Sequence, residues 1–270
     1  MPLFSIVIPT HDRPDFLAEA LASVQAQRCT DFECIVVDDC STTPAVIPGD
    51  DRFRVIRRAV NGGPAAAVNA GLAEARGDYV IRLDDDDLFT PERLDIASAG
   101  IARAPIALCW ARYLDEAPSP QTVLEGDVSG RILDRVTPHM GSAAVARELF
   151  LPLDESYLGS EDVEWWLRIS AHAPVATVER FGYLIRRHSG PRVLHGVAAR
   201  AAGSRRMLEE HADYFAAHPR AAALRWKRIG LNELQLGNRS AARRAFLESM
   251  RARPELRTMK HLARSWLPSA

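Results

Sequence analysis

The sequence predicts an α/β fold with a mainly parallel, doubly wound sheet and a C-terminal helical extension. Two observations support this fold class. In the first hundred residues, short apolar runs alternate with segments that carry apolar residues at helical spacing. Strands separated by helices favour parallel pairing, with helices on both faces of the sheet. After Pro191 the pattern is helical.

The elements follow in a regular order. The first apolar run, Phe4–Pro9, ends at proline, and Pro14 opens a segment with apolar residues at helical spacing. The other expected strands are Glu33–Val37, Phe53–Arg57, Asp78–Leu83, Ile106–Tyr113, Val175–Val178 and Phe181–Arg187. The other expected helices are Pro64–Ala75, one that begins after Pro91, Ser160–His172, Leu224–Gly237 and Asn238–Arg253. The last two are expected to form a hairpin that turns at Gly237.

Length and composition are those of a globular protein. The chain has 270 residues, of which 47% are hydrophobic and 26% charged, enough to bury a full core. No apolar run approaches the roughly 20 residues that span a bilayer, so we expect a soluble, unprocessed chain. The cysteines, Cys29, Cys34, Cys40 and Cys109, form no CxxC pair, which fits a reducing cytoplasm.

Charge is unevenly distributed along the chain. From Arg200 to the end there are 15 Lys and Arg against 6 Asp and Glu, a net charge of +9, while the remainder carries about −10. The basic part is compatible with peripheral contact at the inner face of a membrane, with an acidic acceptor or with a second copy of the chain. A solvated, Arg-rich helix surface explains the same charge. We expect no nucleic-acid partner.

Polar or acidic loops follow three of the expected strands: Thr10–Arg13, Asp38–Thr42 and Asp84–Asp87. In open α/β sheets, ligands bind beyond the carboxyl ends of the strands, so these loops are expected to converge on one crevice. A carboxylate in such a loop, as at Asp39, can accept hydrogen bonds from a base or from ribose hydroxyls. The sequence therefore predicts a nucleotide site.

The four adjacent aspartates of Asp84–Asp87 are the most informative feature. Their carboxylates repel one another, and Mg²⁺ or Mn²⁺ bound with phosphate oxygens would offset that repulsion. Charge alone favours a solvated acidic turn. However, the chain contains neither a Gly-x-Gly-x-x-Gly motif after its first strand nor a P-loop, so a nucleotide diphosphate would have to be held by metal.

Together these motifs resemble the family 2 glycosyltransferases, inverting enzymes of GT-A fold that use nucleotide sugars. The resemblance rests on Ser5-Ile-Val-Ile-Pro-Thr-His-Asp-Arg13, Val36-Val-Asp-Asp-Cys-Ser41, Asn61-Gly-Gly-Pro64, Gly77-Asp-Tyr-Val-Ile-Arg-Leu-Asp-Asp-Asp-Asp87 and Pro91-Glu-Arg-Leu94. Order and spacing match over about the first hundred residues. The later segment Ser160-Glu-Asp-Val-Glu-Trp-Trp-Leu-Arg168 is similar to the Glu-Asp motif of the family's acceptor lobe.

The resemblance implies a role for individual residues. It implies that the donor nucleotide contacts Pro9, Thr10, Asp12, Arg13, Asp39, Asp84 and Asp85. Asp86 and His188 would bind the metal, and Asp162 would be the catalytic base. The corresponding regions are a donor lobe at 1–115, an acceptor lobe at 116–190 and a basic helical region at 191–270.

Several functional questions stay open at this stage. A UDP-sugar is the favoured donor, and the acceptor hydroxyl belongs to a glycan, a lipid-linked sugar or a small molecule. One alternative is a non-catalytic module of the same fold that binds a nucleotide sugar or a glycan. A sugar nucleotidyltransferase is less favoured, because Thr10–Pro14 is neither glycine-rich nor strongly basic.

Overall fold

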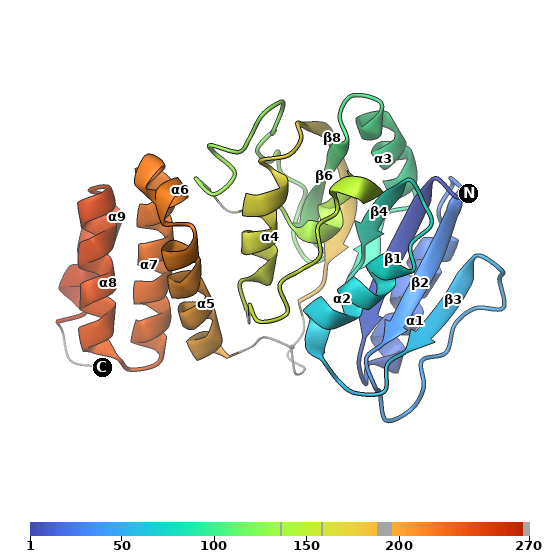
Figure 1. Cartoon of the computed structure of the whole chain (residues 1–270), viewed down its shortest axis with the longest axis horizontal. Helices are drawn as coiled ribbons and strands as arrows, with labels where there is room; N and C mark the ends of the chain where they lie inside the picture. Colours follow the sequence, from blue (N-terminus) through green and yellow to red (C-terminus); the bar gives the residue numbers. More distant parts are fainter. Residues whose placement is uncertain (136, 158, 188–195, 267–270) are drawn as a thin grey trace. The chain divides into compact units, whose positions relative to one another are not determined.

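The computed structural model describes residues 1–135, 137–157, 159–187 and 196–266 (Figure 1). The chain divides into two compact units. The first comprises Met1–Val128, Pro138–Glu155 and Arg168–Gly190, and the second comprises Ser129–Thr137, Ser156–Leu167 and Pro191–Ala270. This division assigns no functions, so the three functional regions expected from the sequence stay a prediction.

The first unit is built on one mixed sheet. Its elements are β1 (Phe4–Thr10), α1 (Pro14–Gln25), β2 (Phe32–Asp38), β3 (Phe53–Arg57), α2 (Gly63–Ala73), β4 (Tyr79–Arg82), β5 (Leu88–Phe89), α3 (Arg93–Ile101), β6 (Ile106–Tyr113), β7 (Ala143–Ala146) and β8 (Val175–Ile185). In the described residues these strands form an eight-stranded sheet in the order β3-β2-β1-β4-β7-β6-β8-β5.

The expected α/β fold is confirmed, with two differences in detail. Strands β1 to β4 pair in parallel, as do β6 and β8. Two short strands that the sequence analysis did not predict, β5 and β7, pair antiparallel with their neighbours. The separate strands expected at Val175–Val178 and Phe181–Arg187 form the single strand β8, and its register against β6 shifts near Trp110.

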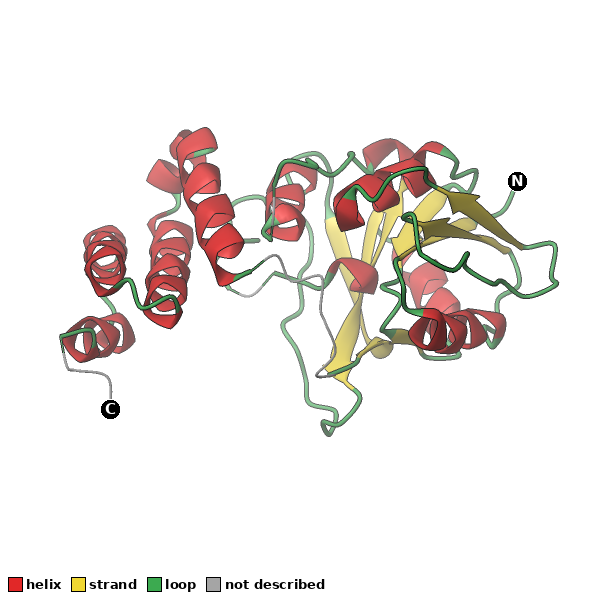
Figure 2. Ribbon diagram, turned by 90° about the horizontal axis from the view of Figure 1, so that it is seen from below, coloured by secondary structure: helices red, strands yellow, loops and turns green. Residues whose placement is uncertain are grey.

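Helices cover both faces of this sheet (Figure 2). Phe4, Ile6 and Ile8 alternate along β1 and belong to a core that also contains buried residues of α1 and α3. The intervening Val7 points to the other face, where α2 lies so close that a Cβ atom on Gly71 would be 2.4 Å from Val7 Cγ1.

The turn before β4 depends on a glycine that contacts the backbone of β1. A Cβ atom on Gly77 would lie 2.5 Å from the backbone nitrogen of Ser5 and 2.6 Å from the carbonyl carbon of Phe4. Backbone atoms in a central strand cannot give way, so we expect Gly77→Ala to lower the free energy of unfolding by about 2 kcal/mol. Urea unfolding measures this. The control is Gly49→Ala, where no atom lies within 4 Å of the added Cβ, and equal losses in the two variants would contradict the prediction.

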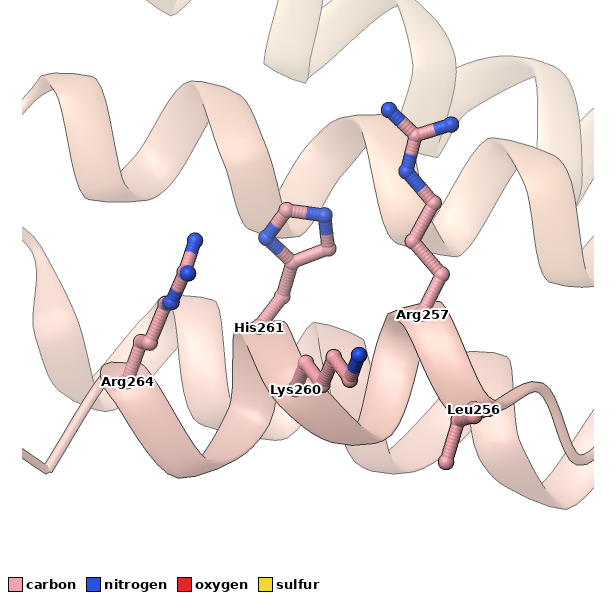
Figure 3. A pocket seen from close by; sticks show the side chains of 5 residues that line it. All are labelled: Leu256, Arg257, Lys260, His261 and Arg264. Atoms are coloured by element: carbon pink, nitrogen blue, oxygen red, sulfur yellow. The ribbon is translucent and has the colours of Figure 1, made fainter.

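The second unit is helical. It contains the start of α4 (Glu161–Ile169), then α5 (Val197–Glu210), α6 (Ala212–Ala217), α7 (Pro219–Gln235), α8 (Arg239–Ala252) and α9 (Leu256–Arg264). The expected hairpin is confirmed as α7 and α8, and Gly237 turns the chain with a φ of 79°. Figure 3 draws α9, which packs on α8. In the described part of the chain, every helix falls short of the length and apolar character that crossing a bilayer requires.

Candidate active site

Two strand-end loops of the first unit are held together by direct contacts. Thr10, the last residue of β1, donates from Oγ1 to Oδ2 of Asp85 at 2.8 Å. Arg13 lies just before α1, and its Nη1 is 3.0 Å from Oδ1 of Asp85 and 3.1 Å from Oδ2 of Asp86. Because β1 and β4 are parallel neighbours, their carboxyl ends lie at the same edge of the sheet. The expected convergence of these loops is confirmed.

The loop after β2 joins the same group through Asp12. The backbone N–H of Thr42 donates to Oδ1 of Asp12 at 2.7 Å, and the N–H of Asp12 donates to Ser41 Oγ at 3.0 Å. Asp12 and Cys40 both have left-handed φ angles, 51° and 64°. Residues other than glycine adopt this conformation at a cost of roughly 1 kcal/mol or more, and such strain gathers at functional sites.

Asp39, expected to contact the donor nucleotide, has several partners within the protein. The N–H groups of Gly62 and Gly63 donate to its carboxylate at 3.1 and 2.7 Å, and the Arg58 guanidinium pairs with it. Gly63 begins α2, so the charge of Asp39 also complements the positive end of that helix. Asp39 thus anchors the β2 loop to α2. Its contact with a nucleotide base stays a prediction.

The acidic turn after β4 alternates between buried and half-buried carboxylates. Asp85 and Asp87 are buried, whereas Asp84 and Asp86 are half-buried. Burial raises the pKa of Asp85 to about 6, although Arg13 and Thr10 act against that rise. Burial, together with the negative charge of Asp84, raises the pKa of Asp87 to about 7. The turn therefore holds two carboxyl groups that are costly to ionise without a nearby cation.

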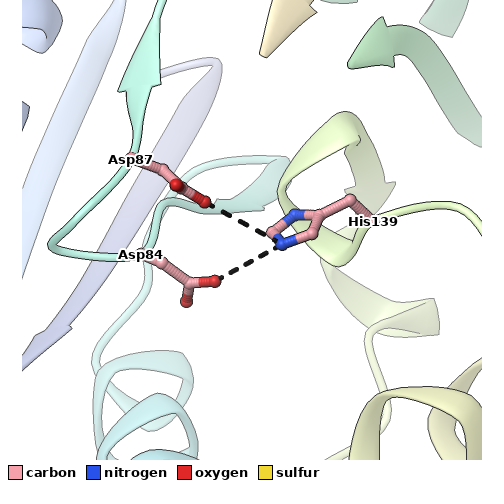
Figure 4. A group of neighbouring side chains, drawn as sticks. All are labelled: Asp84, Asp87 and His139. Atoms are coloured by element: carbon pink, nitrogen blue, oxygen red, sulfur yellow. Dashed lines mark ion pairs between the residues drawn. The ribbon is translucent and has the colours of Figure 1, made fainter. Parts of the chain in front are cut away.

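Asp84 and Asp87 both point toward His139, a residue from a distant part of the chain (Figure 4). The Nε2 atom of His139 is 3.7 Å from Oδ2 of Asp84 and 3.9 Å from Oδ2 of Asp87. One ligand atom of each residue lies within 4.8 Å of the other two. Burial acts to raise the pKa of Asp84, but the charges of Arg82 and His139 outweigh it and lower that pKa. The carboxylate oxygens of Asp84 and Asp87 are ligands of the kind that Mg²⁺ and Mn²⁺ prefer.

A hydrogen bond to Nδ1 of His139 argues against metal ligation through its Nε2. The N–H of Gly141 donates to His139 Nδ1 at 3.3 Å, so a neutral ring carries its proton on Nε2, the atom that faces the two carboxylates. A histidine that ligates a metal usually donates from its other nitrogen instead. In this arrangement, Asp84 and Asp87 fit a divalent cation, and His139 fits the role of a positive or proton-donating neighbour.

Two residues of the site come from the end of β8 and the position that follows it. The Tyr183 hydroxyl donates to Oδ2 of Asp87 at 2.9 Å and accepts the N–H of Asp84 at 3.3 Å. The N–H of Arg186 donates to Oδ1 of Asp87 at 2.8 Å. The Arg186 side chain pairs with Glu19. No local motif marks His139 or Tyr183. The pairing of β8 with β5 and β6 brings Tyr183 to the turn, and the pairing of β7 with β4 and β6 brings His139, which lies just before β7.

The remaining expected site residues lie elsewhere. Pro9 is buried within β1. Asp162 lies in the first turn of α4 and belongs to the second unit. Its charge acts on Arg225, a buried guanidinium whose pKa is lowered by burial to about 10. His188 lies outside the described residues. The roles of Asp86, His188 and Asp162 stay predictions.

The sequence profile described as glycosyl transferase family 2 matches residues 5–118. Residues 5–118 form a glycosyl transferase family 2 domain. This domain contains Thr10, Arg13 and the whole acidic turn Asp84–Asp87, whereas His139, Tyr183 and Asp162 lie beyond its end.

The domain is similar to the putative colanic acid biosynthesis glycosyl transferase WcaA of Escherichia coli. The two are 37% identical over 101 residues, which are 35% of this chain and 36% of that protein. The aligned segment thus spans about a third of the relative's length.

Two solved structures share the fold over 97% of this chain. One is S. aureus TarS 1-349 in complex with UDP-GlcNAc, with a TM-score of 0.69, 20% identity and 84% of that chain covered. The other is the mannosyltransferase PcManGT from Pyrobaculum calidifontis in complex with GDP-Man and Mn²⁺, with a TM-score of 0.57, 19% identity and 79% covered. These likenesses confirm the GT-A fold with C-terminal helices that the sequence predicted.

Proposed function

We propose that this protein is an inverting glycosyltransferase that moves a sugar from a nucleotide-diphosphate sugar to an acceptor hydroxyl. The observation that carries the proposal is the junction of Thr10 and Arg13 with the acidic turn, within a family 2 domain. That junction places cationic, hydroxyl and carboxylate groups at the carboxyl ends of parallel strands, where nucleotides bind in α/β sheets.

A divalent metal is part of the proposal. The acidic turn offers two ligand sets, Asp86 as the family pattern implies, and Asp84 with Asp87 as the geometry favours. A bound Mn²⁺ or Mg²⁺ would stabilise the negative charge of the departing nucleotide diphosphate. Arg13 neutralises the carboxylates of Asp85 and Asp86, and Tyr183 and the Arg186 N–H hold the Asp87 carboxylate in place.

Asp162 is the proposed catalytic base. It would take the proton of the acceptor hydroxyl as that oxygen attacks the anomeric carbon and the bond to the diphosphate breaks. A single displacement of this kind inverts the anomeric centre and needs one base. The position of Asp162 in the first turn of α4 supports this role only in combination with the donor domain, because acidic residues also stabilise helix N-termini.

A UDP-sugar is the proposed donor. TarS, the fold neighbour with the higher TM-score of the two described above, has been solved with UDP-GlcNAc, whereas PcManGT has been solved with GDP-Man. The acceptor class and a cytoplasmic location stay predictions from the sequence.

The test is a binding and turnover screen of the full chain against UDP-, dTDP- and GDP-sugars, with Mn²⁺, with Mg²⁺ and with EDTA. We expect metal-dependent binding of one nucleotide class, and slow hydrolysis of its sugar to a product of inverted configuration. Binding without any turnover, in the presence of a wide acceptor panel, would favour a non-catalytic binding module. Failure of every nucleotide sugar to bind would refute the donor site.

A further inference from the structure

Helix α9 presents a group of cations without acidic partners. An open groove of about 530 Å³ runs along it, lined by Leu256, Arg257, Lys260, His261 and Arg264 (Figure 3). Within the described part of the chain, no ion pair is found for Arg257, Lys260 or Arg264. Other cations of the same helical unit do have partners, as in Lys227 with Glu255 and Arg251 with Glu248.

These cations lie close together on one flank of the helix. Arg257, Lys260 and Arg264 are spaced three and four residues apart, which places them on the same side of an α-helix. In Figure 3 the side chains of Arg257, His261 and Arg264 extend from the same side of α9. Burial, with the charges of Arg257 and Arg264 next in effect, lowers the pKa of His261, which agrees with a locally positive surface.

Apolar side chains are exposed on the adjoining flank. Leu256 is 65% exposed, Met259 48% and Trp266, two residues past the helix end, 69%. The helix is held from the opposite side, where Thr258 and Ser265 are buried. The outward surface of α9 is therefore half apolar and half cationic. Large apolar residues exposed beside unpaired cations are typical of helices that lie in a membrane interface.

We propose that α9 docks this protein on an anionic phospholipid surface. Leu256, Met259 and Trp266 enter the boundary between headgroups and acyl chains, while Arg257, Lys260 and Arg264 bind lipid phosphates. The apolar flank and the cationic flank of α9 then both contact the lipid surface. A soluble polyanion would leave the apolar half in water, and a second copy that met the same face would bring the unpaired cations of the two copies together. This docking is peripheral, since α9 spans only Leu256–Arg264.

The experiment measures co-sedimentation of the full chain with phosphatidylglycerol vesicles and with phosphatidylcholine vesicles. The wild-type protein is expected to bind the anionic vesicles and to stay in solution with the neutral ones. The charge variant Arg257→Gln/Lys260→Gln/Arg264→Gln is expected to lose about a hundredfold in partitioning, because each of the three basic residues near an anionic surface contributes roughly a fivefold factor.

Two further variants separate docking from simple charge attraction. The apolar variant Leu256→Ser/Met259→Ser/Trp266→Ser retains every cation and is expected to lose roughly tenfold or more in partitioning. The control Arg220→Gln/Arg244→Gln/Arg251→Gln removes the same charge from exposed positions of α7 and α8 and is expected to lose much less than the charge variant. Circular dichroism checks that all three variants retain their helices.

Three outcomes would overturn the proposal. If the apolar variant partitioned onto the vesicles as strongly as the wild-type protein, α9 would act only as a non-specific cationic patch. Release of the protein from vesicles by an equal phosphate concentration of soluble glycerol phosphate would identify a free-anion site. A dimer in sedimentation velocity that the apolar variant dissociates would identify a second copy as the occupant. None of these measurements uses a sugar donor, so they test the docking proposal separately from the proposed transferase activity.

Discussion

Replacing Asp162 with asparagine is expected to lower kcat about a thousandfold and to change donor affinity by less than about threefold. Asparagine has nearly the same size and cannot accept the proton of the acceptor hydroxyl at neutral pH. The donor contacts proposed for the first unit, at Thr10, Arg13 and the acidic turn, are untouched by this change. Steady-state turnover and calorimetric binding of the nucleotide sugar measure the two effects separately.

Glu161 provides the matched control for this prediction. It precedes Asp162 in the same helical turn, and its Oε2 atom is buried without a hydrogen-bond partner within the described part of the chain. Glu161→Gln removes the same charge from the same helix end, so any general effect on the helix is shared by both variants. If Glu161→Gln loses turnover and Asp162→Asn retains it, the base has been assigned to the wrong carboxylate.

Replacing Asp87 with asparagine is expected to weaken Mn²⁺ binding about a hundredfold or more, and metal-dependent donor binding with it. Asp87 is buried, its carboxylate lies close to that of Asp84, and a bound cation offsets the repulsion between the two. The amide oxygen of asparagine can still accept from the Arg186 N–H, and its NH₂ group can donate to the Tyr183 hydroxyl, so the turn is expected to keep its shape. Titration of Mn²⁺ followed by electron paramagnetic resonance measures the affinity.

The same titration of Asp86→Asn and His139→Asn shows whether Asp86 or His139 binds the metal in addition to Asp84 and Asp87. The Asp86 carboxylate is ion-paired with Arg13, and His139 Nδ1 accepts a backbone N–H, so each is expected to cost less than about tenfold in Mn²⁺ affinity. If Asp86→Asn lost more Mn²⁺ affinity than Asp87→Asn, Asp86 would be the metal ligand, as the family pattern implies. A hundredfold loss in His139→Asn would require the imidazole to bind the ion directly.

Much of the first unit was predictable because its signals are local. The strands β1 to β3 and β6 are short apolar runs, and α1 and α2 begin at or next to proline, which fits the first turn of a helix. Carboxylates placed directly after such strands must lie at one edge of a parallel sheet. The junction of Thr10 and Arg13 with the acidic turn therefore followed from the order of residues along the chain.

The rest of the site depends on pairing between distant segments. Strands β5 and β7 are too short to carry a periodic signal, and they form because β8, β4 and β6 offer them backbone partners. Those pairings bring Tyr183 and His139 to the acidic turn. The four aspartates have nearly the same sequence context, so their separate roles arise from burial and from which partner reaches each one.

The sequence by itself predicted the fold class and the family 2 character of residues 5–118, and it marked the acidic turn after β4 as a candidate site, because strand and helix periodicities and strand-end motifs are read within a few residues. Only the tertiary structure decided that Asp84 and Asp87 share a site with His139 and that α9 turns apolar and cationic side chains outward together. The first depends on contacts between segments far apart in the chain, which burial and electrostatic pairing select, and the second depends on which side of α9 packs against α8.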